Sequence, residues 1–194
     1  MSVIRNFLVS PFIRNLNAAR KITYIAVMTA LSVICNLLLE WKFVSVQFSL
    51  TIAVSVVTGV LVGGGTGFVI AFIGDLIGYF GGNFSVIGYT PWIGLSTGLM
   101  AFFGGIINIG SKKKAFLFIK IAIVSVLILV FCTICINTTF LYFYLTKGSS
   151  VSYAEYVVIR LFVKGQIWNS LFNYALLFIT VPLLLELKPF KRFF

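Results

Sequence analysis

The sequence predicts an all-α integral membrane protein, a bundle of six transmembrane helices. Of the 194 residues, 60% are hydrophobic and 10% are charged, whereas an ordinary soluble domain has about 25% charged residues. The mean hydropathy is +1.11. A chain of this composition cannot cover itself with a polar surface, so we expect it to lie in a membrane. The net charge of +11 does not indicate nucleic acid, because most bases stand at the ends of apolar runs.

The apolar runs predict a single transmembrane domain over residues 1–194. The expected helices cover about 22–39, 43–61, 65–80, 92–109, 115–145 and 153–187. The fifth run exceeds the ~20 residues that cross a bilayer, so we expect it to tilt or to extend beyond the hydrocarbon. Ser152 and Glu155 have the spacing of a capping box at the start of the last helix, which we expect to bend near Pro182.

The basic residues predict that both termini are cytoplasmic. With six spans, both ends share one side with the turns after the second and fourth helices. That side carries ten bases: Arg5, Arg14, Arg20, Lys21, Lys112, Lys113, Lys114, Lys188, Lys191 and Arg192. The opposite loops, at 40–42, 81–91 and 146–152, hold only Lys42 and Lys147. The positive-inside rule therefore places these loops outside, and we expect residues 1–20 to lie on the cytoplasmic membrane surface.

The polar inventory disfavours an enzyme. The chain has no histidine, and its four acids, Glu40, Asp75, Glu155 and Glu186, are far apart in sequence. Most hydrolytic and metal-dependent chemistry needs histidine or paired carboxylates, so we expect no catalytic residue, metal or cofactor. Cys132 and Cys135 have the spacing of a redox or metal motif, but they lie in an apolar run without a second pair, so we expect ordinary packing.

The stretch 63–91 is the most informative part of the chain. It begins with a glycine cluster, continues through an apolar helix that contains Asp75, and ends in a loop of Gly, Asn, Tyr and Pro. A charge at membrane depth usually faces protein or a water-filled cavity, and a glycine-rich helix lets neighbouring backbones approach closely. These features predict a helix that faces a ligand and a loop that covers the site.

Other polar and aromatic residues are expected at the same outer half of the bundle. Tyr79 shares the face of Asp75, and Arg160 and Lys164 lie on one face of the last helix. We predict a small-molecule site formed by Trp41, Asp75, Tyr79, Asn83, Tyr89, Trp92, Asn137, Arg160 and Lys164. Gln166, Asn169 and Asn173 form a second polar stripe. An alternative is that Asp75 forms a structural ion pair with Arg160 or Lys164.

Several motifs resemble the substrate-binding S components of energy-coupling factor (ECF) vitamin transporters, more specifically the folate family. They are AVMTA in the first helix, GDLIG at 74–78, GYTPWIGLSTGLMAFFGGI from Gly88, INTTFLYFYL from Ile136 and VIRLFVKGQIW from Val158. The order of the motifs matches over about residues 20–187. At the turn between the second and third helices, Val62-Gly63-Gly64 stands where that family often has Phe-Gly-Pro.

The resemblance implies a bacterial plasma-membrane protein that captures folate or a related vitamin-like compound outside. It would associate with a transmembrane scaffold subunit and two cytoplasmic ABC-type ATPases, since this chain has no nucleotide-binding Gly-rich motif of its own. Ala26 and Ala30 would dock the scaffold, although small residues four apart also serve internal packing. Hydroxymethylpyrimidine, pantothenate and a queuosine precursor are alternative substrates. A membrane assembly or regulatory subunit without a ligand is the alternative function.

Overall fold

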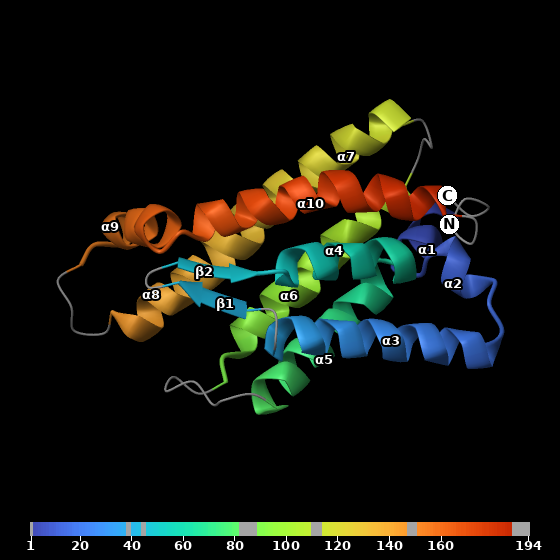
Figure 1. Cartoon of the computed structure of the whole chain (residues 1–194), viewed down its shortest axis with the longest axis horizontal. Helices are drawn as coiled ribbons and strands as arrows, with labels where there is room; N and C mark the ends of the chain where they lie inside the picture. Colours follow the sequence, from blue (N-terminus) through green and yellow to red (C-terminus); the bar gives the residue numbers. More distant parts are fainter. Residues whose placement is uncertain are drawn as a thin grey trace.

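The computed structural model describes residues 2–37, 40–43, 46–81, 89–109, 114–146 and 151–187. Its α-helices and strands are α1 (Ser2–Leu8), α2 (Pro11–Arg14), α3 (Ala18–Leu37), β1 (Glu40–Phe43), β2 (Val46–Ser49), α4 (Thr51–Val62), α5 (Gly64–Gly81), α6 (Pro91–Gly104), α7 (Lys114–Leu127), α8 (Thr139–Leu145), α9 (Tyr153–Val158) and α10 (Gln166–Glu186). The long helices lie roughly side by side in an elongated bundle (Figure 1). One end carries β1, β2, α8 and α9, and we call it the hairpin end. The opposite end carries α1 and α2, and we call it the terminus end (Figure 1).

The described part of the chain contains four helical segments long and apolar enough to cross a membrane. They are Ala18–Leu37, Gly64–Gly81, Phe116–Leu145 and Gln166–Glu186. α4 is apolar but has only 12 residues, about 18 Å at 1.5 Å per residue. The chain is therefore a helical, multi-pass membrane protein, with shorter helices packed between the long ones.

The expected helix over 43–61 begins later than predicted. β1 and β2 pair antiparallel with Trp41 opposite Phe48, and α4 starts only at Thr51. The sequence signal for the second strand is an alternation in which Ser45, Gln47 and Ser49 separate apolar residues. A period of two places alternate side chains on opposite faces of a strand, which an α-helix cannot do.

The last two predicted helices are not regular α-helices. A π-helical segment, Ile128–Thr138, joins α7 to α8, and another, Ile159–Val163, follows α9. Gly165 then has a φ of 69° at the start of α10, a left-handed conformation that glycine adopts without steric cost. The predicted helix 153–187 is therefore interrupted at Lys164–Gly165, whereas Pro182 lies within α10. The capping box of Ser152 and Glu155 is confirmed.

Small residues bring α4, α5 and α6 into backbone contact. A Cβ added to Gly59 of α4 would overlap the carbonyl of Ala101 in α6, and one added to Gly67 of α5 would lie 2.9 Å from the Cα of Gly59. α5 also meets α3, where Gly74 packs on Ser32. This is the close packing that the glycine-rich stretch predicts.

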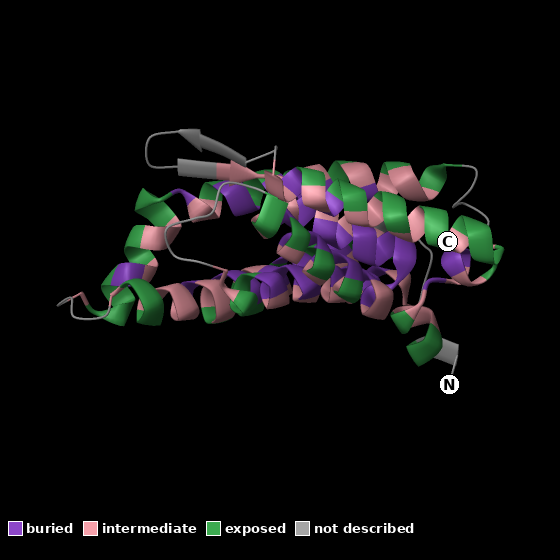
Figure 2. Cartoon of the chain, turned by 90° about the horizontal axis from the view of Figure 1, so that it is seen from below, coloured by how far each residue is buried: buried purple, intermediate pink, exposed green. Residues whose placement is uncertain are grey.

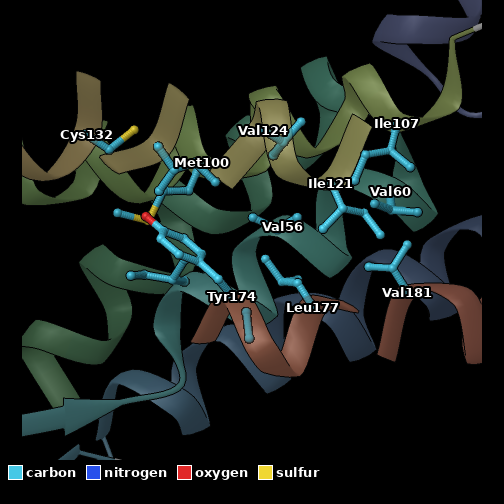
Figure 3. Packing of buried hydrophobic residues seen from close by; sticks show 13 residues of the cluster. Val56, Val60, Met100, Ile107, Ile121, Val124, Cys132, Tyr174, Leu177 and Val181 are labelled. Carbon is cyan, nitrogen blue, oxygen red and sulfur yellow. The ribbon is translucent and has the colours of Figure 1, made fainter. Parts of the chain in front are cut away.

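The main hydrophobic core lies between α4, α6, α7 and α10. Figure 3 shows Val56 and Val60 of α4 facing Ile121 of α7 and Leu177 of α10, and all four side chains are at most 1% exposed. In Figure 2 the buried residues concentrate in the middle of the bundle, whereas the long outer helices alternate between buried and exposed faces. Large exposed side chains such as Ile179 and Val126 are consistent with a surface that faces lipid.

The N-terminal segment packs against the bundle more closely than an interfacial segment requires. Ser10 is fully buried, and its Oγ donates a hydrogen bond of 2.6 Å to the carbonyl of Leu61. Phe12 and Ile13 are also buried. Gly63, with a φ of 108°, lies under this segment, because an added Cβ would come 2.6 Å from the Ser10 nitrogen. α1 and α2 therefore support the turn between α4 and α5.

Candidate functional site at the hairpin end

Asp75 lies in the hairpin-end half of α5, turned toward α6. It is buried, with 9% of its surface exposed. A Cβ added to Gly94 of α6 would lie 3.2 Å from the Asp75 Oδ2 and 2.6 Å from the Tyr89 Oη. The absent side chain of Gly94 thus lets a carboxylate and a phenol approach the backbone of α6 closely. Gly94 was not predicted as a site residue, and the only sequence signal for it is its place in the small-residue pattern IGLSTG.

Aromatic rings stand beside this carboxylate. The ring of Tyr89 lies 5.1 Å from that of Tyr79 and 5.9 Å from that of Phe80, between centroids. Burial, and then the nearby Asp75 carboxylate, raise the pKa of the Tyr89 phenol. The Tyr89 Oη is buried and has no hydrogen-bond partner in the part of the chain described. Asp75, Tyr79 and Tyr89 were all predicted as site residues, and the structure brings the three together.

Arg160 lies in the π-helical segment after α9 and is half-buried. Its guanidinium lies beside Tyr156, and its Nε is buried without a hydrogen-bond partner among the described residues. Lys164, by contrast, is exposed beside the break at Gly165. Within the described ranges neither base forms an ion pair with Asp75, so the structural pair considered above is not formed. A half-buried cation without an acidic partner is a favourable position for an anionic ligand group.

Trp92 and Asn137 belong to a neighbouring groove between the start of α6 and α8. The Trp92 ring stacks on Phe140 with centroids 4.0 Å apart. The groove has a volume of about 190 Å³, and its lining includes both residues together with Thr90 and Tyr144. The Asn137 Oδ1 is buried and unpaired within the described chain. These two predicted residues therefore lie near one another, and Trp92 is 45% exposed.

Two predicted site residues cannot be placed in the site. Trp41 belongs to β1, but its side chain lies outside the described residues, as does the whole of Asn83. The predicted docking residues, Ala26 and Ala30, are exposed on α3. That helix is the least buried of the long spans, so its outward face is available to a partner.

The second polar stripe is structural in two of its three members. The Asn169 Oδ1 accepts a hydrogen bond of 3.0 Å from the Ser49 N–H, and the Asn173 Oδ1 accepts one of 3.0 Å from the Ala53 N–H. Both asparagines are buried. They join α10 to β2 and to the first turn of α4, so they position the hairpin rather than leave polar groups for a ligand.

Several of the buried, unpaired polar atoms of the described chain lie at the hairpin end. Tyr89 Oη, Asn137 Oδ1, Arg160 Nε and Asn36 Nδ2 are buried and lack a hydrogen-bond partner in the described parts of the protein. A buried polar group without a partner costs about 1–3 kcal/mol, and a ligand that supplies the partners recovers this cost. The arrangement suits a small molecule that has aromatic surface, hydrogen-bonding groups and negative charge.

Comparison with known proteins identifies the class. The family model described as ECF-type riboflavin transporter, S component, matches residues 16–189. The chain belongs to this family. It is therefore a component of an ECF-type transporter, a protein that binds a substrate and works with an energy-coupling module, and the resemblance to S components is confirmed.

A solved structure gives the fold of this S component independent support. The structure titled "Crystal structure of FolT bound with folic acid" matches with a TM-score of 0.63 and 17% sequence identity. The match covers 82% of this chain and 91% of that chain. At this identity the likeness establishes a shared fold. No curated protein sequence gives a significant match.

Proposed function

We propose that this S component captures folate, or a related anionic vitamin-like compound, on the outer side of a bacterial plasma membrane. The hairpin end would face outward and both termini would be cytoplasmic, with six spans in all. Support comes from Arg14, Arg20 and Lys21, which lie at the terminus end, and from the start of α7 at Lys114. Bases of this kind favour the cytoplasmic side.

The observation that carries the proposal is Arg160 at the hairpin end, whose Nε is buried without a hydrogen-bond partner in the described chain. The family name points to riboflavin, whose ring system and ribityl chain are neutral, whereas folate has carboxylates. A half-buried guanidinium without an acidic partner among the described residues favours the substrate that has a negative charge. Asp75 would accept hydrogen bonds from the ring of the ligand, and Tyr79 and Tyr89 would enclose that ring.

Delivery would require partners. We infer that Ala26 and Ala30, on the exposed face of α3, dock a transmembrane scaffold subunit, and that two cytoplasmic ABC-type ATPases supply the energy. Small side chains four residues apart let another helix approach closely. The low burial of α3, of which 11% is buried inside the chain, supports a partner on this side. The energy-coupling module would be shared with other S components.

The test of substrate identity is purification of the full chain in detergent, followed by mass spectrometry of any small molecule that copurifies. Ligand-free protein is then titrated with folic acid, riboflavin, pantothenate, hydroxymethylpyrimidine and a queuosine precursor. The proposal expects folic acid to be retained or to bind most tightly. Preference for a neutral compound would overturn the substrate assignment, and failure to bind any of them would overturn the capture function at this site.

A further inference from the structure

Asn36 is a polar residue of the hairpin end that the predicted site does not include. It lies in the last turn of α3 and is half-buried. Its Oδ1 accepts a hydrogen bond of 3.0 Å from the Oγ1 of Thr51, the first residue of α4. That bond fixes the orientation of the amide and leaves the Nδ2 as the free donor. The Nδ2 is buried and has no partner in the described chain.

α5 places this donor near Asp75. A Cβ added to Gly78 would lie 2.9 Å from the Asn36 Cβ and 3.7 Å from its Nδ2, so the amide packs directly on α5. Gly78 is three residues beyond Asp75, about 4.5 Å along the helix axis. α4 begins only at Thr51, so the amide lies at the end of that helix. The Asn36 amide therefore packs on α5 about one helical turn, along the helix axis, from the position of Asp75 at the hairpin end.

We propose that Asn36 is a ligand-binding residue that acts with Asp75 to recognise a lactam edge, a ring carbonyl next to a ring N–H. The Asn36 Nδ2 donates to the carbonyl, and the Asp75 carboxylate accepts from the N–H. This inference rests on the proposed function, because it takes the hairpin end as the substrate site. It deepens that function by naming the chemical group that the protein recognises, a lactam edge, which pterin and flavin rings share.

The donor and acceptor pattern gives a selective test. Aminopterin is folic acid with an amino group in place of the ring carbonyl, so it offers a donor where folic acid offers an acceptor, and its adjacent ring nitrogen carries no hydrogen. Full-length wild-type protein, Asn36→Leu and Asn36→Asp are titrated with folic acid and aminopterin by isothermal calorimetry in detergent. Asn108→Leu is the matched control, because Asn108 is also a half-buried asparagine. Its Nδ2 donates a hydrogen bond to the Val60 carbonyl, and its Oδ1 is unpaired within the described chain.

Wild-type protein is expected to prefer folic acid. Asn36→Leu should lower the affinity for folic acid by about tenfold or more. Asn108→Leu should leave that affinity within about threefold of the wild-type value, since changes distant from a site rarely couple to it. Asn36→Asp removes the donor and adds an acceptor, so it should shift the affinity ratio toward aminopterin. This variant also serves if Asn36→Leu folds poorly, since its side chain has nearly the same size.

Each outcome separates this inference from the proposed function. If wild-type protein binds folic acid and both Asn36 variants keep the wild-type affinity ratio, the role of Asn36 is disproved and the capture function stands. If wild-type protein binds riboflavin in place of folic acid, the substrate assignment fails. The same variants are then titrated with riboflavin, whose ring also has a lactam edge, and unchanged affinity would again disprove the role of Asn36. If neither compound binds, both proposals are overturned.

Discussion

Asn173 of α10 caps the first turn of α4 from across the bundle. Its Oδ1 accepts a hydrogen bond of 3.0 Å from the Ala53 N–H, and its Nδ2 donates one of 2.7 Å to the Ser49 carbonyl. α4 has no capping side chain of its own at Leu50. The first N–H groups of a helix need partners from outside the helix. A residue 120 positions away therefore performs the capping and joins the hairpin to α10.

Replacement of Asn173 by leucine should destabilise the fold. The substitution keeps the side-chain volume but leaves the buried N–H of Ala53 and the partly buried carbonyl of Ser49 without this partner, so we expect a loss of about 2–4 kcal/mol. Thermal unfolding in detergent measures this loss. Gln166→Leu is the control on the same helix, because that side chain is only half-buried, and its melting temperature should stay close to the wild-type value. A stable Asn173→Leu protein would show that the cap contributes little.

The fold was largely predictable because its main signals are local. Apolar runs bounded by bases locate the long helices, and the spacing of Ser152 and Glu155 locates the start of α9. The hairpin at 40–49 was missed because its short alternating segment lies next to a long apolar run. The π-helical segments were missed because apolar composition alone does not distinguish α from π hydrogen bonding. The break at Gly165 depends on the positive φ of one residue, and a single glycine in the sequence does not predict such a conformation.

The candidate site was predictable in composition but not in arrangement. Asp75 was predicted as a site residue because acids are rare in apolar helices, and a single acid in such a helix usually has a function. Tyr89 faces Asp75, whereas Trp92 faces the groove near Asn137. These different positions depend on tertiary contacts. The capping role of Asn173 also depends on a partner distant in sequence. Such pairings are set by how the helices pack, and no local pattern encodes them.

Arg160→Gln should discriminate between charged and neutral substrates. Loss of a hydrogen bond to a charged group costs about 1.5–3 kcal/mol, so the affinity for folic acid should fall about 10- to 150-fold. The affinity for neutral riboflavin, if measurable, should change little. Equilibrium titration of both ligands provides the comparison. Lys164→Gln removes an exposed base nearby and should have a small effect on either ligand. Equal losses in the two variants would remove Arg160 from its proposed role.

Large side chains on the exposed face of α3 should separate binding from transport. Ala26→Trp with Ala30→Trp places bulk where a partner helix would approach, so we expect uptake to be abolished while ligand affinity stays at the wild-type level. Uptake is measured in cells that express the energy-coupling subunits, and copurification reports association. Ile179→Trp, at another exposed position on α10, is the control and should transport normally. If the paired α3 variant still associates, docking occurs elsewhere.

The capping box of α9 should make that helix sensitive to acid. The Ser152 N–H donates a hydrogen bond of 2.9 Å to the Glu155 carboxylate, and this bond lowers the pKa of Glu155 below its ordinary value of 4.5. Because the folded-state pKa is depressed, the stabilisation is present above the ordinary pKa and is lost as the pH falls through the folded-state pKa. Glu155→Ala should therefore melt slightly earlier than wild-type protein at neutral pH.

The difference between wild-type protein and Glu155→Ala should shrink as the pH falls. Carboxyl NMR of selectively labelled glutamate reports the titration directly. Ser152→Ala removes the hydroxyl that accepts the Glu155 N–H and should raise the Glu155 pKa toward the ordinary value, because the side chain of Ser152 also lowers it. A wild-type Glu155 that titrates at its ordinary value would mean that the capping box is not formed in solution.

The central claim is that a small molecule binds at the hairpin end against Asp75. The most direct measurement is equilibrium titration of ligand-free wild-type protein and Asp75→Asn with the compound that copurifies with the wild type. The substitution keeps the size of the side chain and removes one carboxylate acceptor, so the affinity should fall by about tenfold or more, with an unchanged melting profile. Glu186→Gln, at the terminus end of α10, should bind as wild type does. An Asp75→Asn protein that binds the ligand with wild-type affinity would contradict the account.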